Sequence, residues 1–174
     1  VGRPLGTTVP SGDNRGRLVC TDCGTVHYHN PRIVAGCVPD RGGRILLCKR
    51  AIEPRSGYWT VPAGFMEIGE TMPGAAVRET WEEAEAHVDI GPLIAVVDVI
   101  PARQVHVFFA GTLAEPEYGV GAESLAVDLY APEDIPWDDI AFPSVRIALE
   151  QYLSNRARGV DELRLCTAPG RPTG

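Results

Sequence analysis

The run GFMEIGETMPGAAVRETWEEAEA, residues 64–86, constrains the fold of this chain more than any other stretch. Thr71 can cap a helix and Pro73 is tolerated in a first helical turn, so the sequence predicts a helix over residues 71–87. The predicted helix has an apolar stripe that consists of Ala75, Ala76, Val77, Thr80, Trp81 and Ala84. We expect this stripe to pack against the rest of the domain.

Three glutamates fall on one side of the predicted helix. Glu79, Glu82 and Glu83 are three and four residues apart, and such offsets return to the same helical face. Like charges at these offsets repel one another, and they lie toward the helix C-terminus, where the macrodipole disfavours anions. One interpretation is a solvated acidic face. The other is a divalent cation, because clustered carboxylate oxygens are the ligands that Mg²⁺ or Mn²⁺ requires.

The spacing of the whole run favours the cation. It resembles the signature of the Nudix hydrolases, which reads glycine, five residues, glutamate, seven residues, Arg-Glu, an apolar residue, any residue, Glu-Glu, any residue, glycine and an apolar residue. Six positions match in identity and spacing, namely Gly64, Glu70, Arg78, Glu79, Glu82 and Glu83. Thr80 replaces the usual aliphatic residue. Glu85 replaces the glycine, so we expect the end of the helix to be longer or differently shaped.

The order of elements is typical of a mixed α+β layered domain. Strand-like runs are expected at residues 33–38, 44–50, 58–65, 93–100, 104–113 and 123–130, with a closing helix at 144–157. The resemblance implies the Nudix α/β/α sandwich with a mixed sheet. The predicted segments are a degenerate or truncated zinc-ribbon-like segment at 1–32, a Nudix hydrolase domain at 33–158 and a tail at 159–174.

The resemblance also implies a reaction and roles for the matched residues. Glu79, Glu82 and Glu83 would hold Mg²⁺ or Mn²⁺ and act in catalysis, while Glu70 and Arg78 would pair to brace the loop before the helix. Divalent ions can bridge phosphate oxygens and activate water. The implied reaction is hydrolysis of a diphosphate that links a nucleoside to another group, giving a nucleoside monophosphate and a phosphorylated product.

Such a reaction also needs a general base and groups that bind phosphate. The base would be a glutamate of the signature or a carboxylate from a later loop. Our candidate is Glu123, in the sequence GVGAES between two strand-like runs, and its alternative interpretation is an ordinary loop acid. Arg50 and Arg55 before the signature and Arg103 beyond it are candidates for binding the diphosphate, with plain surface cations as the alternative.

Two flanking patterns concern the substrate. CxxCGxxHYxNP before the signature and IPWDDIAF after it resemble zinc-ribbon Nudix proteins, and those relatives point toward FAD or ADP-ribose. Members that act on NADH carry a Ser-Gln-Pro-Trp signature, which this sequence lacks. We therefore expect a small-molecule nucleotide substrate and, from the resemblance, a homodimer.

The N-terminal part of the chain contains half of a zinc ribbon. Cys20 and Cys23 are separated by two residues and followed by glycine, which is the spacing of a zinc knuckle. A structural site needs four ligands, and no second such pair occurs, so we expect that the first knuckle was lost or precedes residue 1. His27 and His29 could complete the set, but their close spacing strains a tetrahedron. Zinc is not expected at full occupancy, and residues 1–19 are expected to be irregular or appended structure.

Composition argues against several kinds of partner. Lysine and arginine total 16 against 23 aspartate and glutamate residues, and the net charge of −7 disfavours nucleic acid. No apolar run approaches the roughly 20 residues that span a bilayer, and VGRPLGTT lacks the apolar core of a secretory signal. The cysteine pattern fits a reduced compartment. We expect a cytoplasmic protein without membrane or nucleic-acid partners.

Two other functions are alternatives to the hydrolase. The first is a catalytically silent Nudix-fold module that senses a nucleotide without cleaving it, and the complete glutamate set argues against it. The second is a zinc-ribbon protein that contacts nucleic acid, and the half-ribbon and the negative charge argue against that.

Overall fold

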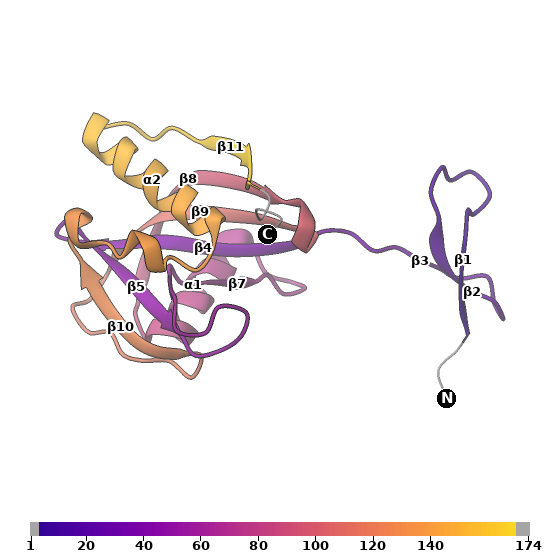
Figure 1. Ribbon diagram of the computed structural model, residues 1–174, viewed down its shortest axis with the longest axis horizontal. Coiled ribbons are helices and arrows are strands. Elements are labelled where there is room, and N and C mark those ends of the chain that lie inside the picture. Colours follow the sequence, from indigo (N-terminus) through magenta and orange to yellow (C-terminus); the bar gives the residue numbers. More distant parts are fainter. Residues whose placement is uncertain (1–3, 170–174) are drawn as a thin grey trace. The chain divides into compact units, whose positions relative to one another are not determined.

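The chain divides into two compact units, Val1–Pro31 and Arg32–Gly174. The computed structural model, shown in Figure 1, describes residues 4–169. Each unit is built on its own β-sheet.

The N-terminal unit is a small antiparallel sheet with the strand order β1-β2-β3. Its strands are β1 (Leu5–Thr8), β2 (Arg17–Cys20) and β3 (Val26–His27). Residues 1–19, expected to be irregular or appended, belong to this separate unit, and they are regular at β1 and β2, which pair along their whole length. β1 reads LGTT and β2 reads RLVC, runs too short for local alternation to define them, so each is defined by pairing with the other. Arg17 also forms an ion pair of 2.8 Å with Asp13.

A mixed sheet forms the centre of the second unit. Its strands are β4 (Arg32–Arg41), β5 (Arg44–Arg50), β6 (Trp59–Thr60), β7 (Ala63–Phe65), β8 (Val88–Val99), β9 (Gln104–Leu113), β10 (Ser124–Tyr130) and β11 (Arg164–Thr167). The main order is β10-β5-β4-β9-β8-β11, with β6 beside β5 and β7 beside β4. The pairs β4–β9 and β8–β11 are parallel, and β10–β5, β4–β5 and β8–β9 are antiparallel. The expected α+β class with a mixed sheet is confirmed.

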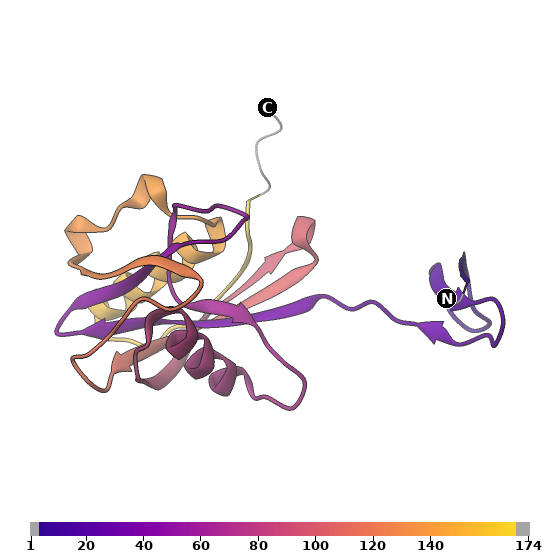
Figure 2. The same ribbon diagram turned by 90° about the horizontal axis from the view of Figure 1, so that it is seen from below.

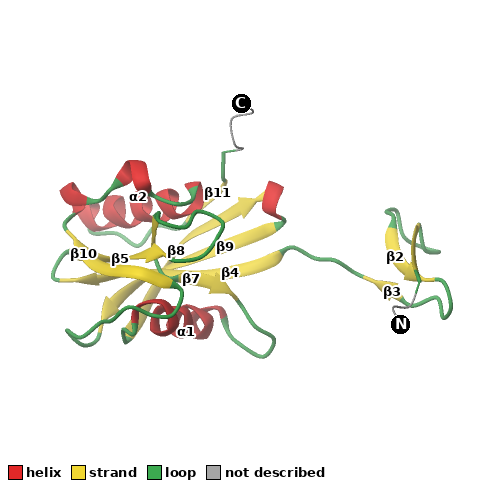
Figure 3. Cartoon of the chain, turned by 60° about the horizontal axis from the view of Figure 1, so that its bottom comes forward, coloured by secondary structure: helices red, strands yellow, loops and turns green. Residues whose placement is uncertain are grey.

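Two helices cover opposite faces of this sheet, as Figures 2 and 3 show. The helices are α1 (Met72–Ala84) and α2 (Pro143–Arg158), with short 3-10 helices η1 (Ile100–Ala102), η2 (Pro132–Asp134) and η3 (Trp137–Asp139) in the connections. Successive strand residues face opposite helices. On β9, for example, Phe108 packs in the cluster that contains Leu149 of α2, whereas Phe109 packs with Ala76 of α1. The unit is therefore the expected α/β/α sandwich.

The predicted elements differ from the observed ones in several respects. The strand expected at 58–65 is divided into β6 and β7, and the strand expected at 93–100 begins earlier, at Val88. Helix α1 ends at Ala84, before residue 87. Val77 and Trp81, which we assigned to the packing stripe, are 39% and 48% exposed, because the helix turns its small residues to the sheet. The segment predicted as a tail contains β11, which adds a parallel strand beside β8. Neither helix of the described chain combines the length and the apolar character needed to cross a membrane.

Candidate functional site

Helix α1 carries most of the candidate site, and both of its ends are capped. At its start, Thr71 Oγ1 accepts a hydrogen bond of 3.1 Å from the N–H of Gly74. At its end, Glu85 adopts a left-handed conformation with φ 47°, and its N–H donates to the carbonyl of Trp81 at 2.8 Å. The helix thus ends in the conformation that glycine favours, so neither the longer nor the differently shaped end that we expected from Glu85 is observed. A side chain in this conformation costs about 1 kcal/mol.

The other departure from the signature, Thr80, is fully buried. Its hydroxyl Oγ1 donates to the carbonyl of Ala76 at 2.7 Å, one helical turn back, and lies 3.3 Å from Sγ of Cys37. A buried hydroxyl with a partner is tolerated in a core, so threonine can replace an aliphatic residue here.

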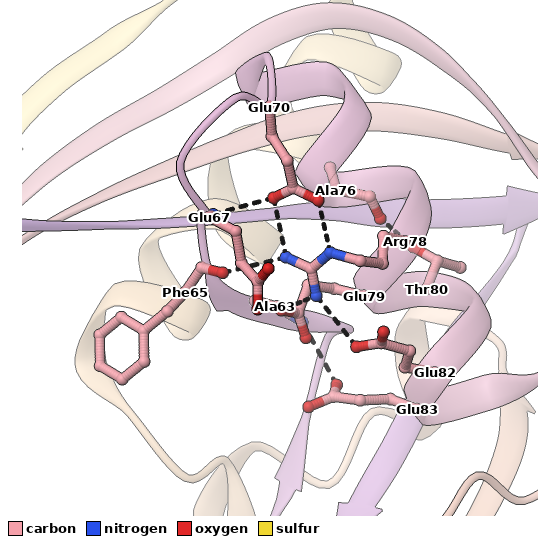
Figure 4. A network of polar contacts seen from close by, with 10 residues as sticks. All are labelled: Ala63, Phe65, Glu67, Glu70, Ala76, Arg78, Glu79, Thr80, Glu82 and Glu83. Carbon is pink, nitrogen blue, oxygen red and sulfur yellow. Dashed lines mark hydrogen bonds and ion pairs between the residues drawn. The ribbon is translucent and has the colours of Figure 1, made fainter.

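Arg78 stands at the centre of a network of carboxylates (Figure 4). Its Nε and Nη2 donate to the two carboxylate oxygens of Glu70 at 2.6 and 3.0 Å. Nη2 also donates to the carbonyl of Phe65 at 3.0 Å. Nη1 donates to Glu79 at 2.7 Å and to Glu82 at 2.9 Å. The rigid fork of the guanidinium therefore fixes the loop and two glutamates relative to one another.

Glu70 is the loop end of this network. Its carboxylate accepts the two bonds from Arg78 and a third of 2.9 Å from the N–H of Glu67. These bonds favour the ionised form and, led by those from Arg78, lower the pKa of Glu70 to about 2. The structure thus brings Glu70 and Arg78 together as the signature implies.

Glu79 and Glu83 are buried against strand β7, with exposed fractions of 9% and 6%. The Glu79 carboxylate lies directly against Gly64, where a Cβ atom would overlap it. Burial raises the pKa of both carboxyls, that of Glu83 to about 8. The N–H of Ala63 donates to Glu83 Oε2 at 3.2 Å and offsets part of this cost. Glu82, by contrast, has a side chain that is about half exposed.

The donor chemistry of these three glutamates fits a divalent cation. Carboxylate oxygens are the hard ligands that Mg²⁺ and Mn²⁺ prefer, and a cation would offset the cost of ionising two buried carboxyls. In the part of the chain that the structure describes, no three Cys, His, Asp or Glu side chains are already gathered as a metal site. Arg78 holds Glu79 and Glu82 instead. A cation would therefore compete with Arg78 for these two carboxylates.

The loop that precedes β10 brings Glu123 to the same region. Its carbonyl accepts a hydrogen bond of 2.8 Å from the N–H of Ala51, at the end of β5. Its negative charge also contributes to the raised pKa values of Glu79 and Glu83. The predicted loop carboxylate thus lies within electrostatic reach of the buried pair.

The contacts that hold this loop on α1 were not assigned from the sequence. The N–H groups of Gly119 and Gly121 donate to the carbonyls of Ala84 and Glu83 at 2.7 and 3.2 Å. The hydroxyl of Ser124 donates to the same Glu83 carbonyl at 2.7 Å. Two glycines separated by one residue are a signal for close backbone approach, but nothing in the sequence reveals the partner of the serine.

The three candidate arginines lie in different places. Arg50 is near the carboxylates, since its charge lowers the pKa of Glu83 against the effect of burial, and its guanidinium lies 5.1 Å from the ring centroid of Phe142. Arg55, on the exposed loop after β5, lies 4.9 Å from the ring centroid of Tyr58. Arg103 follows η1 on an exposed turn. Of the three, Arg50 acts electrostatically on Glu83, and its guanidinium donates to the carbonyls of Pro54 and Ile52 at 3.0 and 3.5 Å.

Cys20 and Cys23 belong to the N-terminal unit. Cys20 is buried, whereas Cys23 is exposed and its Sγ lies 3.1 Å from Thr25 Oγ1. Across residues 4–169 no third Cys, His, Asp or Glu joins them as a ligand, so they do not form a complete zinc site. Each of the five cysteines is a free thiol.

Two family models match this chain. The NUDIX domain model covers residues 29–149, which include the whole carboxylate site. The Nudix N-terminal model, a zinc-ribbon family, covers residues 2–29. The half-ribbon expected from Cys20 and Cys23 is thus of the type found in this family.

Individual proteins agree with the models. NAD-capped RNA hydrolase NudC of Chromobacterium violaceum is 44% identical over 79 residues, 45% of this chain and 29% of that protein. The ADP-ribose pyrophosphatase of Methanocaldococcus jannaschii is 35% identical over 69 residues, 40% of this chain and 41% of that protein. The chain therefore matches less than half the length of either relative.

A solved structure is similar over nearly the whole chain. The crystal structure of a NUDIX hydrolase from Nitrosomonas europaea superposes with a TM-score of 0.91 at 42% sequence identity, covering 95% of this chain and 94% of that one. Together with the model match and the carboxylate geometry, this shows that the chain belongs to the Nudix hydrolase family and carries an N-terminal segment of the Nudix zinc-ribbon type.

Proposed function

We propose that this protein is a divalent-metal-dependent pyrophosphohydrolase. Its substrate is a nucleoside diphosphate linked to another group, ADP-ribose or FAD, and its products are a nucleoside monophosphate and a phosphorylated remainder. One observation carries the proposal. Glu79, Glu82 and Glu83 lie on one side of α1, and the backbone of the Glu123 loop is hydrogen-bonded to the last turn of that helix.

The residues of the site have distinct tasks in this reaction. Bound at the three helix carboxylates, Mg²⁺ or Mn²⁺ would neutralise charge on the diphosphate and make water a better nucleophile. Glu123 accepts a proton as the water oxygen bonds to one phosphorus and the bridging P–O bond breaks. The electron pair of that bond leaves with the second phosphate. Before a cation binds, Arg78 keeps Glu79 and Glu82 in place, because its Nη1 donates to both.

Several observations support a substrate with a second, planar arm. The charge of Arg50 acts on Glu83, and its guanidinium lies 5.1 Å from the ring centroid of Phe142. Its neighbour in the chain, Lys49, lies 5.8 Å from the ring centroid of Trp59, the residue opposite it on β6. Cations next to half-buried rings suit a phosphate followed by a flat ring system. The M. jannaschii relative, whose name is ADP-ribose pyrophosphatase, agrees with this assignment.

The same proposal includes a compartment and an assembly. Free cysteines suit the reducing cytoplasm, and the family resemblance suggests a homodimer. Zinc has no part in the chemistry proposed. Size-exclusion chromatography with light scattering would give the mass of the assembly, and a monomeric mass would contradict the homodimer.

A substrate panel tests the proposal. The purified protein is incubated with ADP-ribose, FAD, NADH, NAD, diadenosine polyphosphates and nucleoside triphosphates, each with Mg²⁺, with Mn²⁺ and with a chelator. We expect metal-dependent release of AMP from ADP-ribose or FAD. If AMP is released only from NAD or NADH, the proposed substrate is wrong but the proposed reaction stands. A folded protein that binds these nucleotides and cleaves none of them would instead support the nucleotide-sensing module.

A further inference from the structure

We propose that Ser124 is a positioning residue for Glu123. Its hydroxyl is hydrogen-bonded to the main-chain carbonyl of Glu83 and thereby holds the main chain next to Glu123 against the last turn of α1. The proposal rests on the hydrolase function proposed above and assigns a residue that lies outside the Nudix signature. Ser124 itself touches neither substrate nor cation in this account.

Ser124 is buried at the junction between the loop and the sheet. Its Oγ donates to the Glu83 carbonyl at 2.7 Å, and its N–H donates to the carbonyl of Gly121 at 3.0 Å. It is also the first residue of β10, where it lies opposite Arg50 of β5. One residue earlier, the Glu123 carbonyl accepts from the N–H of Ala51. Glu123 is therefore fixed on one side to β5 and on the other to helix α1.

The loop lies directly on the last turn of α1. A Cβ atom at Gly121 would overlap the main-chain carbonyl of Glu82, so only glycine allows this approach. The N–H groups of Gly119 and Gly121 bind carbonyls that have no partner within the helix. These main-chain bonds survive most substitutions. The hydroxyl of Ser124 is the side-chain part of the same attachment.

The attachment point explains why a single hydroxyl affects the chemistry. Glu83 uses its side chain at the carboxylate site and its main-chain carbonyl as the anchor for Ser124. The distance from the Glu123 carboxylate to the reacting phosphorus is therefore set by the same helix that holds the helix carboxylates. Displacing a reacting group by about 1 Å can cost about 100-fold in rate.

The test compares Ser124→Thr with Ser124→Val. The two new side chains have nearly the same shape, but only threonine keeps the hydroxyl, so any steric effect is shared. We expect Ser124→Thr to keep kcat within about threefold of wild type and Ser124→Val to lower it by about 10- to 100-fold, with little change in KM. Equal kcat values for the two variants would overturn the proposal. If both fold poorly, Ser124→Ala, which adds no bulk, takes the place of Ser124→Val.

Two further readouts separate positioning from general stability. In a Glu123→Gln background, Ser124→Val should cause no additional loss of kcat, because the group that it positions has gone. Losses that add would overturn the proposal, and so would a Glu123→Gln variant as active as wild type. The affinity for Mn²⁺ alone should stay within about twofold in Ser124→Val, since the helix carboxylates are intact. A wild-type protein that cleaves nothing in the panel would overturn the proposed function itself. If the wild type is active but Ser124→Thr and Ser124→Val have equal kcat values, or the losses in the Glu123→Gln background add, only the role of Ser124 is overturned.

Discussion

Helices α1 and α2 pack on opposite faces of one sheet, and they bury different chemistry. Helix α2 buries four apolar residues, Val145, Ile147, Ala148 and Leu149. The apolar residues that α1 buries are three alanines, and they lie beside Thr80 and the carboxylates of Glu79 and Glu83.

The polar groups on the two faces also differ in how well they are satisfied. On α2, the buried Asn155 donates to the carbonyl of Glu162 at 2.8 Å and accepts from Gln151 at 2.8 Å. On α1, the Glu83 carboxylate has one neutral donor and a pKa raised to about 8. A buried group whose charge is poorly compensated destabilises the fold. The buried carboxyls on the α1 face therefore lower the stability of the fold, whereas the apolar side chains on the α2 face raise it.

Glu83→Gln should have the largest effect on activity, and it should change catalytic activity and stability in opposite directions. We expect kcat in Mg²⁺ to fall by about 10³-fold, on the scale of losing a group that stabilises transition-state charge. In chelator at neutral pH, stability toward urea should rise, because the folded protein no longer has to bury a carboxyl that is ionised in the unfolded chain. Glu150→Gln removes the same charge from the exposed side of α2 and is the matched control. A Glu83→Gln enzyme as active as this control would contradict the assignment of the α1 face.

Leu149→Ala, on α2, should lower stability without changing catalytic activity. Leu149 is fully buried in the cluster that joins α2 to the sheet. Its truncation should lower the free energy of unfolding by about 2–5 kcal/mol. The kcat of the folded enzyme at low temperature should not change, because the residue is on the face away from α1. Urea denaturation and steady-state kinetics on one preparation measure both quantities, and a large fall in kcat with little loss of stability would contradict the division.

His106, which contacts the start of α2, should make the stability of the fold depend on pH. It is buried on β9, where Nδ1 lies 2.9 Å from Ser144 Oγ at the start of α2 and Nε2 lies 2.8 Å from Gln104 Oε1. Burial lowers its pKa to about 4. The unfolded chain takes up this proton near pH 6.5 and the folded protein only near pH 4, so stability falls as the pH drops through that window.

The contribution of His106 to this loss should approach about 3 kcal/mol. The raised pKa of Glu83 acts with the opposite sign, because it stabilises the fold as the pH drops from 8. The contribution of His106 is therefore measured as the difference between wild type and His106→Gln in urea denaturation from pH 7 to pH 4. In His106→Gln the free energy of unfolding should fall less, or rise more, as the pH drops. An unchanged slope would show that other groups cause the acid sensitivity.

Glu85→Gly should have the smallest effect. Glu85 ends α1 with φ 47°, a conformation that costs a side chain about 1 kcal/mol and glycine almost nothing. We expect a rise of about 1 kcal/mol in the free energy of unfolding, with kcat unchanged. Thermal or urea denaturation detects this change. A destabilised Glu85→Gly variant would mean that contact of the Glu85 side chain with Gly119 outweighs the backbone strain.

The sequence predicted those parts of the molecule that depend on local spacing. The glutamates of α1, the pairing of Glu70 with Arg78 and the alternating strands follow from periodicity and from a signature with fixed gaps. The parts that it missed depend on contacts between distant segments. Strand β11 is defined by pairing with β8, and β1 is defined by pairing with β2. The N–H of Ala63 and the hydroxyl of Ser124 reach Glu83 across 20 and 41 residues of chain.

Residue size also misled the assignment of faces. Val77 and Trp81 are apolar, yet they lie on the outside of α1, because the side of the helix that faces the sheet admits only small residues and the carboxylates. In the same way, the left-handed end at Glu85 shows that backbone geometry can be kept without glycine. Both cases are tertiary effects that override a local preference.

In the proposed function, the carboxylates on α1 hold the divalent cation. The most direct test is a calorimetric titration of Mn²⁺ into the wild-type protein, Glu83→Gln and Glu150→Gln, without nucleotide. The account predicts binding to wild type and to Glu150→Gln with similar affinity, and at least about tenfold weaker binding to Glu83→Gln. The same affinity in all three proteins, or no binding to any of them, would contradict it.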